Sequence, residues 1–407
     1  MNVERGSGTG GARVVVVGAG LAGLRTAEEL REAGYDGELV LLGAESHPPY
    51  DRPPLSKEVV RGERDDVSLK PAEFFDEHGI ELRLGAPAVA LDTAARSVAL
   101  ADGSSIGYDH LVIATGLVPR RIPGLPELDG VHVLRTLDDA LALRAEFAPG
   151  RTALVVGAGF IGCELAASMR KSGLEVILVE PQPAPLASVL GPQVGALVGR
   201  LHTAEGVDVR TGTGLTGLLG EGRVRGAVLS DGTEVAADLV VIGIGSVPVT
   251  EWLTDSGVAL ADRAAGGGVL ADEFGRTSDP NVWAVGDVAA WRHHDGSQRR
   301  VEHWTNAGEQ AKVLAYALVG GESPAGEQVP YFWSDQYDIK VQALGEPLAT
   351  DTVHVVRDDG RKFLAYYERD GALSAVVGAG LAGRVMKMRA NIVARVPIAD
   401  VLEPAGV

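Results

Sequence analysis

The sequence predicts an α/β protein with a smaller α+β region at its C-terminal end. Two glycine-rich turns carry this prediction, because each follows a short β-branched run and opens a helical stretch. Composition agrees: the 407 residues include 54 glycines and only 5% aromatic residues, which suits many tight strand-to-helix turns. A chain of this length favours two or three domains.

The first glycine-rich turn lies inside a β-α-β unit. The β-branched run Arg13–Val17 ends in glycines, and a helical stretch with Leu24, Ala27 and Leu30 follows it. The apolar run Glu38–Leu42 then predicts a second strand. Strand, helix and strand in this order form the repeating unit of a parallel sheet.

A second copy of this unit follows in the middle of the chain. It begins at Ala153–Val156, continues through a helix near Cys163–Lys171 and returns to a strand at Val176–Val179. The two glycine turns are 139 residues apart, from Gly18 to Gly157. This spacing indicates a duplicated nucleotide-binding unit and excludes a short-period solenoid.

The first turn, Gly18-Ala19-Gly20-Leu21-Ala22-Gly23, fits the G-x-G-x-x-G fingerprint of dinucleotide-binding folds. Its first glycine permits the tight turn, its second lets the backbone approach a pyrophosphate, and its third lets the helix pack close to the strand. The phosphates are expected on the free N–H groups of the helix N-terminus. Glu45 follows the second strand, where a carboxylate can accept hydrogen bonds from a ribose.

The second turn, Gly157-Ala158-Gly159-Phe160-Ile161-Gly162, repeats the fingerprint, and Glu180 closes its second strand. A carboxylate at that place accepts from a free 2′-hydroxyl and repels a 2′-phosphate. No Arg or Lys lies between Pro181 and Val198 to hold such a phosphate. The sequence therefore favours NAD over NADP, with NADPH the less favoured cofactor.

A third string, Gly378-Ala379-Gly380-Leu381-Ala382-Gly383, has the same residues as the first. No second strand with a terminal acid follows it, so we interpret it as a turn-to-helix junction without a nucleotide. The other two fingerprints predict two Rossmann-like dinucleotide-binding domains. Two dinucleotide sites on one chain suggest a tight flavin and an exchanging nicotinamide, for which hydride transfer is the natural chemistry.

Charge and hydropathy limit the classes of partner. The formal net charge of −18 argues against nucleic acid or an anionic membrane, because both would repel the chain. No run of 18 or more apolar residues is present to span a membrane. The polar, glycine-rich residues 1–11 are expected to form a disordered lead-in, and a cytoplasmic location is expected.

Cysteine usage limits the chemistry. Cys163 is the single cysteine, so no intrachain disulfide can form, which agrees with a reducing cytoplasm. Disulfide reductases need a redox-active cysteine pair, so that class is excluded. No Cys or His cluster has metal-ligand spacing, so we expect no metal site and no iron–sulfur centre of the chain's own.

Several longer motifs are more specific than the glycine fingerprints. They are Pro49–Lys57 (PYDRPPLSK), Ala114-Thr115-Gly116, Leu134–Leu137 (LRTL), Gly286-Asp287-Val288, Glu302–Ala307 (EHWTNA) and Phe332–Gln336 (FWSDQ). With these motifs the chain resembles the FAD- and NAD-dependent ferredoxin reductases of bacterial oxygenase and cytochrome P450 systems, such as putidaredoxin reductase and the biphenyl dioxygenase reductase. The resemblance covers nearly the whole chain. One departure is Val249, where the family usually carries Asn after the proline.

The resemblance implies a glutathione-reductase-like arrangement of domains. Residues 1–119 and 246–322 would form a discontinuous FAD-binding domain, residues 120–245 an NAD-binding domain, and residues 323–407 a C-terminal reductase domain. Within the C-terminal domain, apolar runs predict five short strands. These runs are Tyr331–Trp333, Lys340–Leu344, Val353–Val356, Phe363–Tyr367 and Leu373–Val377, with a helix near Arg384–Val393 after them.

The resemblance also implies the site residues. Lys57 would lie beside flavin N5 and pair with Glu164, so that the two act as catalytic residues that order the nicotinamide against the flavin. Asp287 would accept from the ribityl hydroxyls. The expected FAD-binding residues are Gly18, Ala19, Gly20, Leu21, Ala22, Gly23, Glu45, Arg52, Lys57, Val89, Ala114, Thr115, Gly116, Arg135, Gly286, Asp287, Glu302, His303 and Trp304. The expected NAD-binding residues are Gly157, Gly159, Phe160, Ile161, Gly162, Glu164, Glu180 and Gly245.

The resemblance finally implies a ferredoxin–NAD(+) reductase. Such an enzyme moves hydride from NADH onto FAD and passes electrons singly to an iron–sulfur ferredoxin, which serves a cytochrome P450 or a dioxygenase. Ferredoxins are usually acidic, so a local basic docking patch is expected. Two alternatives stay open: an NADH-dependent flavoprotein oxidase or quinone reductase, and an NADH-sensing flavoprotein that resembles apoptosis-inducing factors.

Overall fold

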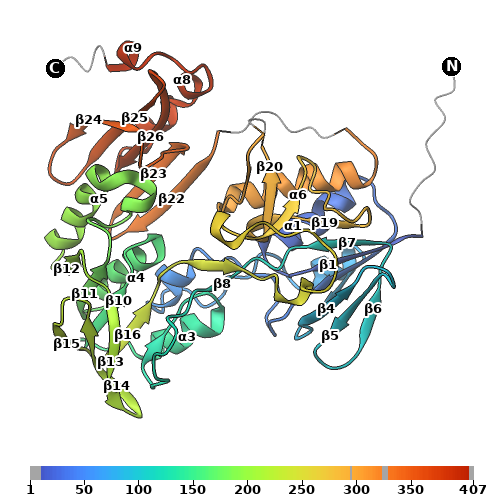
Figure 1. Cartoon of the computed structure of the whole chain (residues 1–407), viewed down its shortest axis with the longest axis horizontal. Helices are drawn as coiled ribbons and strands as arrows, with labels where there is room; N and C mark the ends of the chain where they lie inside the picture. The colour runs from blue at the N-terminus through green and yellow to red at the C-terminus, as the bar shows by residue number, and fades with distance from the viewer. Residues whose placement is uncertain (1–10, 294–295, 323–328, 403–407) are drawn as a thin grey trace. The chain divides into compact units, whose positions relative to one another are not determined.

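The computed structural model describes residues 11–293, 296–322 and 329–402, and the chain divides into two compact units (Figure 1). The first unit consists of Met1–Asp51, Val67–Val118 and Ser246–Gln328; the second consists of Arg52–Asp66, Pro119–Gly245 and Val329–Val407. The expected lead-in lies, apart from Gly11, outside the described residues. The domain boundaries expected from the sequence stay a prediction, and the segment Arg52–Asp66 clusters with the second unit.

The first unit is built on a five-stranded parallel sheet with the order β19-β7-β1-β2-β3. The β-branched and leucine side chains of its central strands are fully buried, which explains why these runs are apolar without alternation. Helices α1 and α6 lie side by side (Figure 1). The bounds are β1 Arg13–Val17, β2 Glu38–Leu42, β3 Ile80–Arg83, β7 His110–Ile113, β19 Val282–Ala284, α1 Leu21–Glu32, α2 Glu73–Glu77 and α6 Trp304–Leu318.

Smaller elements complete the first unit. An antiparallel sheet has the order β4-β5-β6, another three-stranded sheet has the order β18-β20-β21, and strands β8 and β17 pair where the chain crosses between units. The bounds are β4 Ala88–Asp92, β5 Ser97–Leu100, β6 Ser105–Gly107, β8 Leu117–Pro119, β17 Ser246–Pro248, β18 Val269–Ala271, β20 Ala289–Arg292, β21 Gln298–Arg299, and the short helical turns η2 Glu251–Leu253, η3 Arg263–Ala265 and η4 Gly286–Val288.

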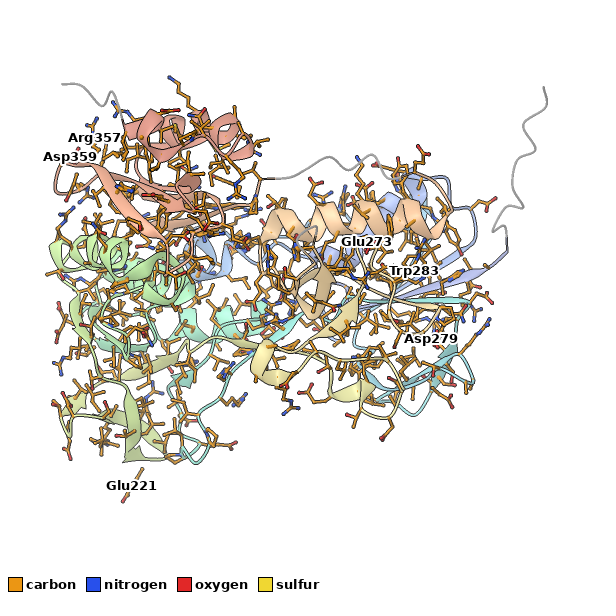
Figure 2. The ribbon with its side chains drawn as sticks, turned by 45° about the horizontal axis from the view of Figure 1, so that its top comes forward. Glu221, Glu273, Asp279, Trp283, Arg357 and Asp359 are labelled. Atoms are coloured by element: carbon orange, nitrogen blue, oxygen red, sulfur yellow. The ribbon has the colours of Figure 1, made fainter. Side chains whose placement is uncertain are left out.

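The second unit contains a second parallel sheet with the order β12-β11-β10-β16-β9. An antiparallel sheet β13-β14-β15 accompanies it, and Glu221 lies at the tip of its first hairpin (Figure 2). The bounds are η1 Leu55–Val59, β9 Val131–His132, α3 Leu137–Ala145, β10 Thr152–Val156, α4 Phe160–Lys171, β11 Glu175–Glu180, α5 Ala187–Ala204, β12 Asp208–Thr211, β13 Leu215–Glu221, β14 Arg223–Leu229, β15 Glu234–Ala236 and β16 Leu239–Ile242.

The C-terminal part of the second unit is an antiparallel sheet with the order β22-β23-β26-β25-β24. Helices α7 and α8 pack against β23 and β26. Two parallel sheets and this antiparallel sheet confirm the predicted fold class. The bounds are β22 Tyr331–Gln336, β23 Ile339–Gly345, β24 Thr352–Asp358, β25 Phe363–Arg369, β26 Ala372–Ala379, α7 Ala382–Lys387, α8 Arg389–Val393 and α9 Ile398–Leu402.

The third glycine string lies where β26 ends and α7 begins, which confirms the predicted turn-to-helix junction. A Cβ at Gly378 would lie 2.7 Å from Cγ2 of Val385, so glycine here lets α7 pack directly on the sheet. The string thus serves packing in an antiparallel sheet and does not follow a parallel β-α-β unit. Within the described residues, no helix is long and apolar enough to cross a membrane.

Candidate active site

The first fingerprint forms a tight turn between β1 and α1. Gly18 has a φ of +116°, and a Cβ there would lie 2.2 Å from the carbonyl oxygen of Ala114. A Cβ at Gly23 would lie 1.9 Å from the oxygen of Gly18. At Gly20, by contrast, a Cβ would meet no heavy atom of the described residues within 4 Å, apart from Gly20 itself, its chain neighbours and the backbone of its own helix. The backbone is therefore open at the position where the fingerprint needs room for a pyrophosphate.

The second fingerprint repeats this geometry between β10 and α4. Gly157 has a φ of +98°, and its Cβ would lie 2.3 Å from the oxygen of Gly243. A Cβ at Gly162 would lie 1.9 Å from the oxygen of Gly157, while the space at Gly159 is again open among the described residues. The same three glycine roles therefore recur in both units.

Both fingerprints open helices whose N-termini suit a phosphate. Helix α1 starts after Gly20 and helix α4 after Gly159, and neither residue has a side chain that could cap the helix. Neither helix has an acidic residue in its first turn. The positive end of each helix dipole therefore faces no carboxylate of its own first turn and can attract an anion. These features fit one dinucleotide at each loop.

Hydrogen bonds fix both carboxylates that are predicted to bind a ribose, Glu45 and Glu180. The Oε2 atom of Glu45 accepts a hydrogen bond from the hydroxyl of Tyr50 at 2.6 Å. Glu180 accepts from the backbone N–H of Ala158 at 2.7 Å and from that of Gln182 at 2.9 Å. Because Ala158 belongs to the second fingerprint, the Glu180 carboxylate lies directly beside that loop.

The predicted Gly-Asp motif lies against the first fingerprint. A Cβ at Gly286 would be 2.6 Å from that of Ala22, so only glycine permits this approach. The N–H of Gly286 donates to the buried side chain of Gln310 at 2.9 Å, which ties the motif to α6. The carbonyl oxygen of Asp287 accepts from Arg300 at 2.8 Å. The structure thus brings Gly286 to the loop that the sequence assigned to FAD.

The Ala114-Thr115-Gly116 motif fixes the segment that departs from the family pattern. The hydroxyl of Thr115 donates to the carbonyl oxygen of Val249 at 2.9 Å, and the N–H of Val249 donates to the oxygen of Gly116 at 3.0 Å. Both contacts use the backbone of Val249. Its position therefore does not require the side-chain amide that the family usually carries there.

The remaining predicted residues of the first unit lie closer to the surface. Trp304 is 37% exposed, and its indole N–H donates to Asp51 at 2.9 Å. Glu302 pairs with Arg300 at 2.8 Å, and His303 directly precedes α6. Val89, on β4, is half exposed. The exposed surface of Val89 and Trp304 leaves both side chains able to contact a ligand.

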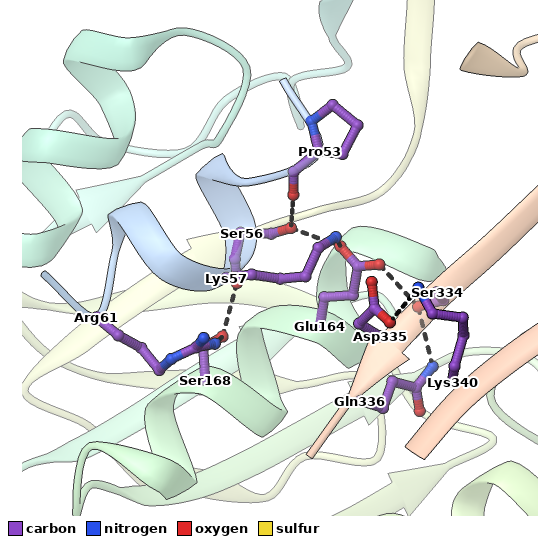
Figure 3. Close-up of polar contacts among 10 residues, drawn as sticks. All are labelled: Pro53, Ser56, Lys57, Arg61, Glu164, Ser168, Ser334, Asp335, Gln336 and Lys340. Carbon is purple, nitrogen blue, oxygen red and sulfur yellow. Dashed lines mark hydrogen bonds and ion pairs between the residues drawn. The ribbon is translucent and has the colours of Figure 1, made fainter. Parts of the chain in front are cut away.

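Lys57 and Glu164 form a buried ion pair inside the second unit, which Figure 3 shows. Lys57 lies on the helical turn η1, and its Nζ is 2.8 Å from Oε2 of Glu164 on α4. Ser56 also donates to Oε2, and the hydroxyl of Ser334 donates to Oε1 at 2.8 Å. Buried charges are tolerated when they are paired and hydrogen-bonded, and this carboxylate meets both conditions.

Five more of the predicted residues lie in the second unit: Arg52, Arg135, Phe160, Ile161 and Gly245. The guanidinium of Arg52 donates to the carbonyl oxygen of Arg135 at 2.5 Å, so the structure brings these two predicted residues together. Gly245 has a φ of +94° and accepts from the N–H of Arg120 at 2.9 Å. The ring of Phe160 meets that of Phe332 edge to face at 5.0 Å, and Ile161 is 43% exposed.

Sequence reasoning did not assign a role to Ser56 or Ser334, although both lie within its motifs. Ser334 is 170 positions from Glu164 in the chain, so no local pattern could show their contact. The single cysteine, Cys163, is fully buried, and burial raises the pKa of its thiol. No group of three or more His, Cys, Asp or Glu residues able to hold a metal is found in the described part of the chain.

Comparison with known proteins identifies the family. The family described as pyridine nucleotide-disulphide oxidoreductase matches residues 12–311, and the reductase C-terminal family matches residues 331–402. Rhodocoxin reductase of Rhodococcus erythropolis is 40% identical over 350 residues, which cover 84% of this chain and 80% of the relative. The ferredoxin–NAD(+) reductase subunit of a Pseudomonas putida benzene 1,2-dioxygenase system is 39% identical over 336 residues, 82% of this chain and 80% of the relative.

A solved structure agrees with these relatives. A chain in the crystal structure of the covalent putidaredoxin reductase–putidaredoxin complex matches with a TM-score of 0.92 and 32% identity. The match covers 98% of this chain and 97% of that one. The resemblance noted from the motifs is therefore confirmed. The chain belongs to the pyridine nucleotide-disulphide oxidoreductase family, among the ferredoxin reductases of bacterial oxygenase and cytochrome P450 systems.

Proposed function

We propose that this enzyme takes hydride from NADH onto FAD and delivers electrons one at a time to a small iron–sulfur ferredoxin. The observation that carries the proposal is the buried ion pair between Lys57 and Glu164, of which Glu164 lies on the helix that the second fingerprint opens. In this proposal residues 1–119 and 246–322 bind FAD, residues 120–245 bind NADH, and residues 323–407 form the reductase C-terminal domain.

The first fingerprint is the proposed FAD site. The open backbone at Gly20, the free helix N-terminus of α1 and the contact of Gly286 with Ala22 support this assignment. Bound there, FAD supplies a two-electron acceptor for hydride that can also release electrons singly. In this proposal the Lys57 ammonium lies beside flavin N5, where a fixed cation favours electron density entering the ring.

Glu164 holds Lys57 for this role. The ion pair is 2.8 Å long and almost fully buried, so neither side chain has the conformational freedom of a surface residue. Hydride transfer depends on holding the donor carbon within about 3–3.5 Å of the acceptor atom. A fixed pair anchored by Glu164 on the proposed nicotinamide-binding helix is suited to defining that alignment.

NADH is the proposed donor in preference to NADPH. Two backbone N–H groups fix the Glu180 carboxylate beside the second fingerprint. A carboxylate there accepts from a ribose 2′-hydroxyl and repels a 2′-phosphate. The names of relatives that are ferredoxin–NAD(+) reductases give independent support.

A ferredoxin is the proposed acceptor because the chain has no sulfur relay. With one buried cysteine, electrons have to leave the flavin directly. Residues 371–399 contain no Asp or Glu in a chain of net charge −18, and they carry Arg384, Lys387, Arg389 and Arg395. Arg384 and Lys387 are exposed on α7, which suits an acidic partner. That ferredoxin would in turn serve a cytochrome P450 or a dioxygenase.

The test is NADH-driven reduction of cytochrome c, with and without a panel of ferredoxins, repeated with NADPH. We expect rapid reduction only with NADH and an added ferredoxin. Fast oxygen uptake with NADH alone would instead indicate an oxidase or quinone reductase. Slow turnover with a long-lived charge-transfer complex would indicate an NADH-sensing flavoprotein.

A further inference from the structure

Strand β22 presents one polar face to the interior of the second unit. Along the strand, Phe332, Ser334 and Gln336 are buried, while Tyr331, Trp333 and Asp335 alternate with them and are partly exposed. This alternation is the normal period of a strand. Two of the three inward residues are polar and fully buried, which is unusual unless their polar atoms have defined partners.

The inward face of β22 contacts helix α4 at two points. The ring of Phe332 packs edge to face on Phe160, a residue of the second fingerprint. One turn further along α4, the hydroxyl of Ser334 donates to Oε1 of Glu164 at 2.8 Å (Figure 3). A strand of the C-terminal sheet therefore reaches the carboxylate that pairs with Lys57.

The direction of the Ser334 hydrogen bond is determined by its second neighbour. A serine hydroxyl has one proton to donate, and an amide nitrogen can only donate. Nε2 of Gln336 donates to the Ser334 oxygen at 3.3 Å, so the single hydroxyl proton is left for Glu164. The carboxylate then has Ser334 on one oxygen and Lys57 with Ser56 on the other.

We propose that Ser334 is a positioning residue for hydride transfer: it fixes the rotation of the Glu164 carboxylate so that Oε2 faces Lys57. This inference rests on the proposed function. The C-terminal sheet thereby completes the nicotinamide side of the site, in addition to any role in docking a partner. Without the Ser334 hydroxyl, Oε1 loses its donor and the carboxylate can rotate away from Lys57.

The test compares FAD-loaded enzyme carrying Ser334→Ala with the wild type. A hydrogen bond to a charged group contributes enough to change a rate by about tenfold to hundredfold. We expect the anaerobic rate of flavin reduction by NADH to fall by about tenfold or more. The dissociation constant for NAD+, measured by titration of flavin fluorescence, is expected to stay within about twofold. Ser334→Thr keeps the hydroxyl and is expected to restore most of the rate.

The matched control is Ser374→Ala. Ser374 lies in the same sheet and also donates to a carboxylate, that of Asp351, at 3.2 Å. The hydrogen bonds that Ser374 makes with described residues include none with Glu164, Lys57, Ser56 or Ser334. We therefore expect Ser374→Ala to leave the rate of flavin reduction unchanged. Flavin content and unfolding temperature are measured for all variants, and rates are expressed per bound flavin, so that a loss of folding is separated from a loss of rate.

A double-mutant cycle decides whether Ser334 acts through Glu164. In a Glu164→Ala background there is no carboxylate to orient, so adding Ser334→Ala is expected to have no further effect. Equal effects in both backgrounds would overturn the inference, as would an unchanged rate in Ser334→Ala alone. Failure of the wild type itself to be reduced by NADH would instead overturn the proposed function, so the two failures are distinguishable.

Discussion

The two β-α-β units have closely matching backbones but different side chains at most positions. Strand β1 and helix α1 recur as β10 and α4 with every boundary moved by 139 residues. Gly18 and Gly157 have left-handed φ values of +116° and +98°, and each closes against a neighbouring carbonyl group. The loop that is proposed to receive a phosphate thus has nearly the same geometry in both units.

The difference that bears on the proposed site lies at the fifth residue of each helix. In α1 this residue is Arg25, which is partly exposed and pairs with Glu28 on its own helix at 2.8 Å. In α4 it is Glu164, which is buried and pairs with Lys57 from a distant part of the chain. The comparison supports the proposal that the fingerprint supplies a place for the nucleotide, while the second residue after it decides whether the helix also takes part in chemistry.

The fourth residue of each helix explains the role of the single cysteine. Cys163 in α4 occupies the position of Leu24 in α1, and both are buried to within 1%. A leucine at the matching position indicates that this site requires a small or medium apolar side chain. Cys163 therefore packs in the core, although the family name refers to disulphide chemistry.

The largest effect on the rate of flavin reduction is expected when the ion pair between Lys57 and Glu164 is broken. Lys57→Met removes the cation but leaves Glu164 with the hydroxyls of Ser56 and Ser334. Removing one fixed electrostatic group at a reacting centre typically costs about 100-fold or more in rate, so the rate of flavin reduction by NADH is expected to fall by about 100-fold. Stopped-flow absorbance of the FAD-loaded enzyme measures it.

Arg25→Met is the matched control for this prediction, because Arg25 holds the same helical position in the other unit. Arg25 is partly exposed, and Glu28 keeps a second partner in Lys70 when Arg25 is removed, so we expect a change in the reduction rate of less than about twofold. Comparable losses in both variants would contradict the distinction between the two helices.

A pH effect is expected from His202 in the second unit. This side chain is fully buried on α5, next to the hydroxyl of Tyr337 at 2.8 Å, and burial lowers its pKa from 6.5 to about 4. Between these pH values the unfolded chain binds a proton that the folded chain does not. The free energy of unfolding should therefore fall by about 3 kcal/mol as the pH drops from 6.5 to 4.

Denaturant unfolding of the FAD-loaded enzyme across this pH range measures the effect. His202→Gln removes the titrating group and is expected to flatten this part of the stability profile, while His78→Gln, at an exposed position of the first unit, serves as the control. A profile with the same slope in His202→Gln as in the wild type would show that His202 is not responsible.

A smaller effect is expected at Glu180 and Glu45, the two carboxylates predicted to bind a ribose. Glu180→Gln removes the charge beside the second fingerprint and is expected to raise KM for NADH by about tenfold, since one charge-assisted hydrogen bond is lost. The preference of the Glu180→Gln enzyme for NADH over NADPH should become smaller, and its flavin content should not change. Glu45→Gln is expected to weaken FAD retention without altering the preference between NADH and NADPH. A Glu180→Gln enzyme with unchanged preference would contradict the assignment.

Local patterns in the sequence were sufficient to predict the elements that form each β-α-β unit. The bounds of β1 and β2 were predicted as observed, because a buried parallel strand is a continuous apolar run that ends at a turn. The predicted strands of the C-terminal sheet all formed, each extending one or more residues beyond its apolar run. Backbone hydrogen bonding continues into flanking polar residues, which the apolar pattern alone does not show.

Contacts between distant segments could not be predicted in this way. The carboxylate of Glu164 receives donors from Ser56 and Ser334, which are 108 and 170 positions away. The π-helical turn that presents Lys57 could not be recognised from a 3.6-residue period either, since it has only the five residues Leu55–Val59 and follows Pro54. The motifs pointed to these residues through the family resemblance, and the structure shows which atoms they contact.

The most direct test of the account is a paired measurement on Gly20→Ala and Gly159→Ala. Both positions have ordinary negative φ values and open space for a Cβ among the described residues, so both variants are expected to fold. We predict that Gly20→Ala loses FAD, whereas Gly159→Ala keeps FAD and shows a higher KM for NADH. Retention of FAD by Gly20→Ala together with its loss from Gly159→Ala would contradict the assignment of the two sites.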